Sequence, residues 1–118
     1  LPLCQVRLMN DANYPWLLLV PRRRGASGIT DLADPDRTQL MREIALATAA
    51  LKAEAACDKI NVAAIGNIVA QLHVHVVARF RTDAAWPKPV WGALPARAYE
   101  KPAVERLLIA LRQRLALA

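Results

Sequence analysis

One long helical pattern, set between shorter runs of strand-forming residues, most constrains what this chain can fold into. It begins at Asp34-Pro35-Asp36, which combines a capping side chain, a proline suited to the first helical position and an acidic first turn. Six residues then recur at helical spacing and predict the stripe that packs on a sheet: Leu40, Met41, Ile44, Ala45, Thr48 and Leu51. Arg42, Glu43 and Lys52 fall outside this stripe.

Four runs have the composition of strands, at residues 5–10, 16–20, 60–65 and 72–80. The first run alternates and leads into turn residues at Asn10 to Asn13, so we expect it to form a hairpin with the second. The second run is continuously apolar between Pro15 and Pro21, which is typical of a strand inside a sheet. Gly66-Asn67 predicts the turn of another hairpin, between the third and fourth runs.

The last third of the chain predicts an irregular segment followed by a second helix. Three prolines between residues 84 and 97 remove backbone donors and restrict their neighbours, so we expect no regular structure there. Pro102 then precedes apolar residues that share one helical face: Val104, Leu107, Leu108, Leu111 and Leu115.

Length and composition predict one soluble domain that spans residues 1–118. The chain is 55% hydrophobic, yet no apolar stretch approaches the roughly 20 residues that a membrane span needs. Leu1 to Asn10 lacks a basic region followed by an apolar one, so no secretory address is visible. Cys4 and Cys57 have no Cys-x-x-Cys spacing, which fits a reducing compartment. We therefore expect a cytoplasmic protein with no membrane contact.

The net charge of +6 favours anionic ligands and speeds their encounter with the protein. The alternative is that the basic residues are ordinary solvated surface charges. Charge alone does not separate nucleotides from nucleic acids. The basic residues are not interleaved with aromatic ones, however, which argues against a nucleic-acid partner.

The chain's only two histidines lie two residues apart in one predicted strand. Strand alternation places Gln71, His73 and His75 on one face of the sheet. Residues 72, 74 and 76 of the same run are apolar and face the other way. Three polar side chains therefore converge on one face.

This polar face has three interpretations. It is simply solvated, with inert histidines, as on many antiparallel sheets. Alternatively, the two imidazoles share a metal ion, for which Cys4, Cys57 and Asp83 are third-ligand candidates without supporting spacing. In the third interpretation, neutral His73 attacks phosphorus, a covalent nucleotidyl-imidazole forms, and water later releases the nucleotide.

Gly66 to Val77, which contains Gln71-Leu72-His73-Val74-His75-Val76-Val77, resembles the signature of the histidine triad family. Tyr14 to Arg23 is similar to the family's strand that ends in an apolar-Pro-basic step, and the resemblance spans roughly Val6 to Trp91. It implies an α+β fold with an antiparallel sheet of about five strands, one long helix and a C-terminal helix. It also implies a homodimer.

The resemblance also implies roles for single residues. His73 matches the nucleophile, and His75 matches the histidine that contacts the phosphate and supports the leaving group. The remaining implied positions lie near the ribose, sugar or phosphates, or help to build the site: Asn10, Asn61, Gly66, Asn67 and Trp91. Attack requires an unprotonated imidazole whose other nitrogen is held by an acceptor, such as a backbone carbonyl.

Three positions depart from the family pattern and suggest a divergent, bacterial-type branch. Gln71 replaces the first histidine, Trp16-Leu17 stands where a Gly-His pair is often found, and Ile68 occupies a position where a hydroxyl is common. Glutamine donates and accepts hydrogen bonds but does not shuttle a proton.

We therefore predict an enzyme that hydrolyses or transfers a nucleotidyl group without a metal or other cofactor. Its substrates would be nucleoside phosphoramidates, dinucleoside polyphosphates or related adenylates. The alternative is a nucleotide- or nucleic-acid-binding module that keeps the fold but turns over weakly because of Gln71.

Overall fold

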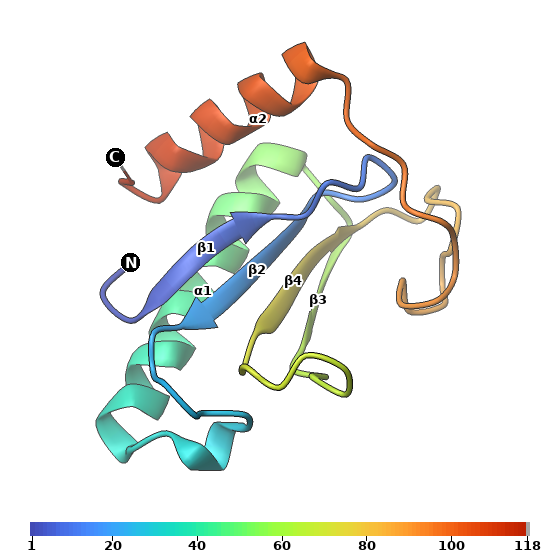
Figure 1. Cartoon of the computed structure of the whole chain (residues 1–118). Coiled ribbons are helices and arrows are strands. Elements are labelled where there is room, and N and C mark those ends of the chain that lie inside the picture. Colours follow the sequence, from blue (N-terminus) through green and yellow to red (C-terminus); the bar gives the residue numbers. More distant parts are fainter. Residues whose placement is uncertain (118) are drawn as a thin grey trace.

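The structure is a computed structural model that describes residues 1–117. Its strands form one antiparallel sheet in the order β1-β2-β4-β3, and α1 lies across one face of that sheet (Figure 1). The second helix packs against α1. The elements are β1 (Cys4–Leu8), β2 (Trp16–Pro21), a 3-10 turn (Ile29–Asp31), α1 (Asp34–Ala55), β3 (Lys59–Ala63), β4 (Val74–Arg79) and α2 (Lys101–Arg114).

The α+β class, the two hairpins and the interior position of β2 agree with the sequence prediction. The expectation of about five strands is wrong for residues 1–117, where the sheet has four. The strands are also shorter than predicted at several ends, with β4 starting at Val74 rather than Leu72. After β4 the chain enters the proline-containing segment 84–97, which forms turns and adds no strand because proline has no backbone donor.

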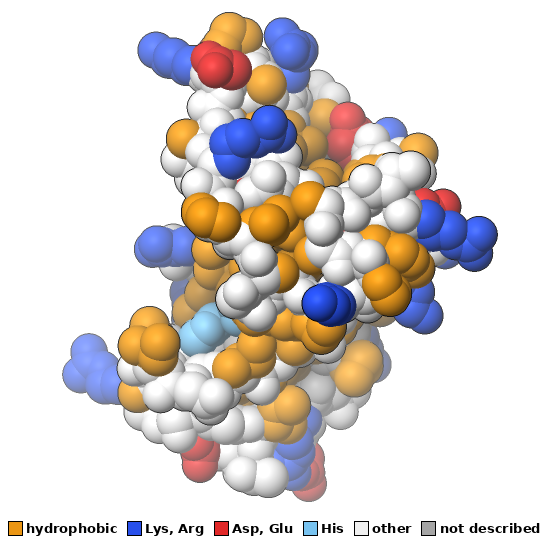
Figure 2. Space-filling view, turned by 90° about the vertical axis from the view of Figure 1, so that its right-hand side faces the viewer, with side chains coloured by type: hydrophobic (Ala, Val, Ile, Leu, Met, Phe, Trp, Pro, Cys, Tyr) orange, Lys and Arg blue, Asp and Glu red, His pale blue; other side chains and the backbone are white. Residues whose placement is uncertain are grey.

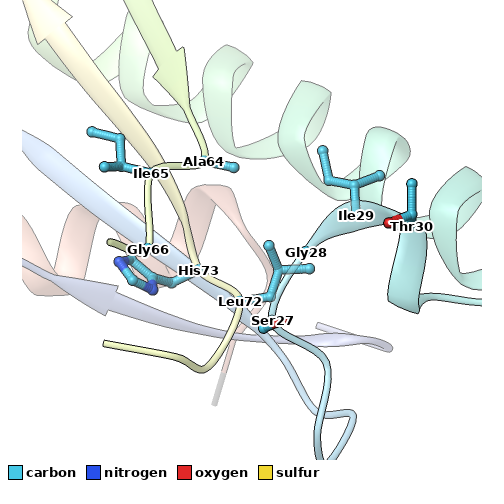
Figure 3. Close-up of a pocket in the computed structure, with 9 residues that line it drawn as sticks. All are labelled: Ser27, Gly28, Ile29, Thr30, Ala64, Ile65, Gly66, Leu72 and His73. Carbon is cyan, nitrogen blue, oxygen red and sulfur yellow. The ribbon is translucent and has the colours of Figure 1, made fainter. Parts of the chain in front are cut away.

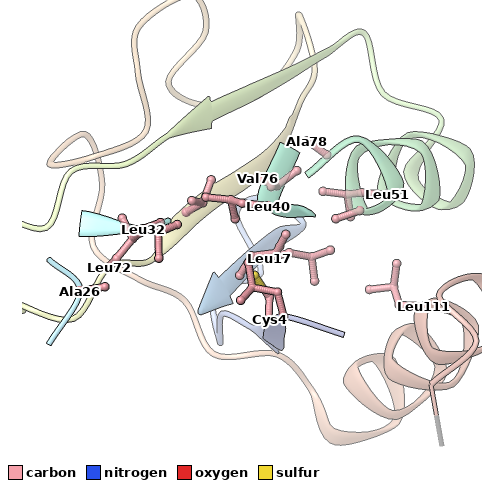
Figure 4. Packing of buried hydrophobic residues seen from close by; sticks show 14 residues of the cluster. Cys4, Leu17, Ala26, Leu32, Leu40, Leu51, Leu72, Val76, Ala78 and Leu111 are labelled. Atoms are coloured by element: carbon pink, nitrogen blue, oxygen red, sulfur yellow. The ribbon is translucent and has the colours of Figure 1, made fainter. Parts of the chain in front are cut away.

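The main core lies between the sheet and the two helices (Figure 4). Leu17 and Leu19 of β2 and Val74 and Val76 of β4 point to the same side, as alternation requires. They meet Leu51 of α1, whose full burial contributes roughly 2 kcal/mol. The even-numbered positions of β4 therefore support the sheet and leave its odd-numbered positions for the opposite face.

The buried stripe of α1 differs from the predicted one. Met41 is 64% exposed and Ala45 also faces solvent, whereas Glu43, which was expected outside the stripe, is 2% exposed. The residues that α1 buries are Leu40, Glu43, Ala47, Ala50 and Leu51. The prediction failed because a charged residue was excluded from the packed face.

Glu43 is buried because it satisfies the backbone at the start of β1. Its carboxylate accepts hydrogen bonds from the amides of Leu3 at 2.9 Å and Cys4 at 2.7 Å. A third comes from Nε2 of Gln39 at 2.7 Å. Burial opposes ionisation, but the hydrogen bonds from Gln39 and the two amides outweigh it and hold the pKa of Glu43 below its usual range.

The N-terminus of α1 also differs from expectation. The capping position is Ala33, which has no side chain to cap with, and Asp34 lies within the first turn. Asp34 pairs with Arg37 one turn later. The acidic first turn still suits the positive end of the helix. Neither helix within residues 1–117 is long and apolar enough to cross a membrane.

Candidate functional site

The face of the sheet opposite α1 carries both histidines. His75 lies in β4, paired with Leu18 of β2 and Ala63 of β3, and His73 lies just before β4. Their ring centroids are 5.1 Å apart. In the space-filling view the histidine surface is recessed among apolar side chains (Figure 2).

A backbone carbonyl orients the His73 ring. Nδ1 of His73 lies 2.7 Å from the carbonyl oxygen of Gln71. Because a carbonyl oxygen only accepts hydrogen bonds, Nδ1 carries the proton. In the neutral ring, Nε2 then has a free lone pair.

His75 is held as the opposite tautomer. Nε1 of Trp16 donates a hydrogen bond to Nδ1 of His75 at 3.0 Å, so in the neutral ring Nε2 carries the proton. Burial, and secondly the proximity of His73, hold the pKa of His75 below its usual range. His75 is only 8% exposed, so the interpretation of a simply solvated face is wrong for this residue.

Two tryptophans form an aromatic wall around His75. The Trp16 ring lies 5.6 Å and the Trp91 ring 5.2 Å from the His75 ring, between centroids. The two indoles meet edge to face at 6.0 Å. Nε1 of Trp91 is buried and has no partner within the described residues. The predicted site residue Trp91 therefore does lie beside the histidines.

Asp83 holds the segment that brings Trp91 to this place. Its carboxylate accepts hydrogen bonds from the amides of Phe80, Ala85 and Trp86 and so fixes the turn after β4. It also forms a buried, two-pronged ion pair with Arg79, at 2.9 and 3.1 Å. Burial opposes ionisation of Asp83, but Arg79 and the amides outweigh it and lower its pKa.

Arg79 also binds the side chain of Asn61. Its Nη1 donates to Oδ1 of Asn61 at 2.8 Å, and its guanidinium lies over the rings of Tyr14 and Trp86. The family resemblance predicts Asn61 as a site residue, whereas no sequence motif singles out Arg79. The structure places Asn61 beside Arg79, and its amide oxygen is already bonded there.

The loop before β4 places Gly66 and Asn67 close to the histidines. Together with Ile65, both line a hollow that contains His73, His75 and Trp91. Gly66 adopts a φ of +60°, a conformation that residues with a side chain rarely take, so a glycine is required here. Ile68, the residue after Asn67 in this loop, is 97% exposed.

His73 stands where three hollows meet. One is formed with Gly66, Leu72 and the segment 27–30 that leads into the 3-10 turn (Figure 3). The second is the hollow shared with His75 and Trp91. The third lies over β1 and β2 and also contains Gln71. No other residue is shared by all three.

Gln71 and Asn10 are placed differently with respect to His73. The Gln71 side chain lies in the third hollow, where its Nε2 donates to the carbonyl of Pro21 at 3.2 Å. Asn10 lies in the turn after β1, where its side chain accepts a hydrogen bond from the Tyr99 amide. The structure does not bring Asn10 into any of the three hollows.

The candidate third metal ligands lie away from the histidine pair. Cys4 belongs to the core beneath α1, Cys57 packs against that core, and Asp83 is engaged with Arg79. Within residues 1–117, no three Cys, His, Asp or Glu side chains are grouped closely enough to hold a metal ion.

A family model described as the HIT domain matches residues 1–82. The chain belongs to the HIT, or histidine triad, family. A histidine triad protein from Bradyrhizobium japonicum is 51% identical, with a TM-score of 0.96 over 98% of this chain and 86% of that one. The histidine triad protein from Sinorhizobium meliloti is 42% identical, with a TM-score of 0.94 over 97% and 84%. No curated protein sequence matches the chain.

A more distant HIT structure shares the fold alone. It is described as a hypothetical histidine triad nucleotide-binding protein from Sulfolobus tokodaii and is 17% identical, with a TM-score of 0.73 over 97% of this chain and 78% of that one. That Gln71 stands at the first triad position, with His73 and His75 at the next two, stays a prediction from the sequence.

Proposed function

We propose that this HIT protein hydrolyses or transfers nucleotidyl groups through a covalent intermediate on Nε2 of His73. The observation that supports this most directly is the 2.7 Å contact between His73 Nδ1 and the Gln71 carbonyl. This contact places the proton on Nδ1 and so leaves the lone pair on Nε2, which supports Nε2 as the nucleophile, beside the three hollows that His73 lines.

In the first step, the Nε2 lone pair of His73 forms a bond to the α-phosphorus while the bond from phosphorus to the leaving group breaks. The imidazole thereby gains positive charge, and the Gln71 carbonyl stabilises the N–H that carries it. In the second step, water forms a bond to phosphorus and loses a proton to the surrounding solvent, while the phosphorus–Nε2 bond breaks and its electron pair returns to Nε2, which regenerates neutral His73.

His75 acts in this scheme as a hydrogen-bond donor. Its Nδ1 is occupied by the Trp16 indole, so its Nε2–H is the group available to a phosphate oxygen or to the leaving group. Backbone donors around Gly66 and Asn67 add to the stabilisation of phosphate charge. Gln71 orients its neighbours but relays no proton, which favours leaving groups that depart as stable anions.

The competing function is a nucleotide-binding module that turns over slowly or not at all. The observation in its favour is that the Gln71 side chain already bonds the Pro21 carbonyl and lacks a titratable group. Nucleotide affinity without product formation would support it.

We further propose that the chain acts as one cytoplasmic domain and forms a homodimer, as HIT proteins commonly do. The edge strand β3 carries the exposed Val62, and Ile65 follows it, also exposed. Light scattering coupled to size-exclusion chromatography tests the dimer, and a monomeric mass at micromolar concentration would contradict it.

The deciding experiment follows AMP release from adenosine 5′-phosphoramidate and from diadenosine polyphosphates, with intact mass spectrometry of the protein. We expect release and an adenylyl adduct in the unmodified protein, and neither in His73→Ala. Arg42→Ala, an exposed change on α1, is the matched control and should retain both. Tight binding of AMP without release or adduct would favour the binding module.

A further inference from the structure

A shallow hollow on the open face of the sheet joins β1 to the site at His73. Leu18, Val20 and Val69 give it an apolar floor, Arg7 and Gln5 lie on its β1 side, and His73 lies at its other end. Its volume is about 240 Å³. The apolar floor favours a flat, weakly hydrated group over a free phosphate, because the binding of such a group buries apolar surface.

The strand register sets how far Arg7 stands from the histidines. Arg7 pairs with Leu18, and Leu18 pairs with His75, so the three residues form one row across β1, β2 and β4. Neighbouring strands lie about 4.8 Å apart, which puts the Arg7 backbone roughly 10 Å from that of His75. A nucleotide whose α-phosphate is at His73 can extend its base along this row toward Arg7.

In the part of the chain that the structure describes, the Nη groups of the Arg7 guanidinium are free to donate hydrogen bonds. Its Nε donates to Oε1 of Gln5 at 3.3 Å, and this contact orients the guanidinium along the strand. Within residues 1–117, no carboxylate lies within ion-pair distance of Arg7. Arg23 and Arg114, in contrast, are both exposed and paired with carboxylates. The Nη groups of Arg7 therefore remain available to a ligand in the hollow.

We propose that this hollow binds the nucleobase and that Arg7 makes the protein prefer guanine over adenine nucleotides. The two Nη groups form a fork that matches two adjacent acceptors, as N7 and O6 of guanine are. Adenine presents N7 beside an amino group, and that donor would face another donor on Arg7. The proposal rests on the nucleotide-binding function proposed above and adds the identity of the base.

The test compares binding of GMP and AMP by calorimetry, in the unmodified protein and in Arg7→Gln. We expect the unmodified protein to bind GMP about tenfold more tightly than AMP, the low end for a two-pronged arginine contact because the hollow is open to water. Arg7→Gln should abolish or reverse the preference, because it weakens GMP binding and because a glutamine amide matches N7 and the amino group of adenine. Arg42→Gln, on the opposite side of the sheet, should keep the preference.

Turnover of guanosine and adenosine 5′-phosphoramidates should show the same preference, mainly in KM. Equal affinity of the unmodified protein for GMP and AMP, or no binding of either, overturns the proposal. An equal loss of affinity for GMP and AMP in Arg7→Gln also overturns the proposal, since Arg7 would then bind the phosphate and not the base. A preference for GMP in binding without turnover would support the base assignment and count against the catalytic function.

Discussion

Glu43 offers the sharpest test of how this fold is held together, because one carboxylate satisfies two backbone amides of another element. In Glu43→Ala the amides of Leu3 and Cys4 lose their acceptor while buried. Each unsatisfied buried donor costs about 1–3 kcal/mol, and the lost side chain leaves a gap besides. We expect a loss of about 3–6 kcal/mol, a large share of the stability of a small domain.

Glu43→Gln separates the charge from the geometry. The glutamine side-chain oxygen still accepts a hydrogen bond from one backbone amide, but its amino group faces the other amide, which is also a donor. We therefore expect roughly half the loss of stability seen for Glu43→Ala. Urea unfolding at pH 7 measures both losses, with Glu105→Gln, an exposed change on α2, as the control that should leave stability unchanged.

The pH dependence follows from the lowered pKa of Glu43. The contribution of the carboxylate is fully present above the ordinary value of 4.5 and is lost as the pH falls through the lower pKa of the folded state. The difference in the free energy of unfolding between the unmodified protein and Glu43→Gln should therefore become smaller in acid. Equal stability of the two at pH 7, or a gap that stays constant down to acid unfolding, would refute this reasoning.

Four further results are expected. In an NMR titration, the His75 ring should change charge below the ordinary value of 6.5, since burial disfavours its cation; a midpoint above 6.5 would contradict the buried neutral ring. Burial, with a smaller effect from Glu43, raises the pKa of the Cys4 thiol to about 12. Iodoacetamide at pH 8 should therefore label Cys4 only after unfolding, and rapid labelling of Cys4 in the folded protein would contradict this prediction. Trp16→Phe removes the hydrogen-bond donor to His75 and should lower the rate of nucleotide turnover about fivefold, because such a bond is worth roughly 1 kcal/mol. An unchanged rate would show that the Trp16 indole has no part in the mechanism. Gln71→His should speed turnover of phosphoramidates more than that of diadenosine polyphosphates, because only the former leave as a basic nitrogen; equal acceleration would argue against a proton relay at this position.

Periodicity alone predicted much of the fold. The alternation in residues 71–77 placed His73 and His75 on one face, and the structure finds both there because Val74 and Val76 must face α1. The continuous apolar run of β2 likewise predicted an interior strand. The fifth strand came from family resemblance and not from any alternating run in this chain.

The buried charges could not be predicted from local patterns. Glu43 is satisfied by amides about 40 positions earlier in the chain, and no local pattern reveals that pairing. Arg79 and Asp83 stand four apart, a spacing that also suits an exposed pair, and only the tertiary packing buries them. The family resemblance implies that Asn61 lies near the sugar or phosphates, and no local pattern reveals that Arg79 already bonds its amide oxygen.

The acceptor that orients His73 is a main-chain oxygen, and this has a consequence for how such a site can evolve. A side-chain acceptor would be lost by a single substitution, whereas every amino acid at position 71 supplies the same carbonyl. The side chain at this position can therefore change while the tautomer of the neighbouring imidazole stays the same. In the proposed mechanism, a substitution at position 71 would then change the contact to the leaving group, while Nε2 of His73 would keep its orientation and its lone pair.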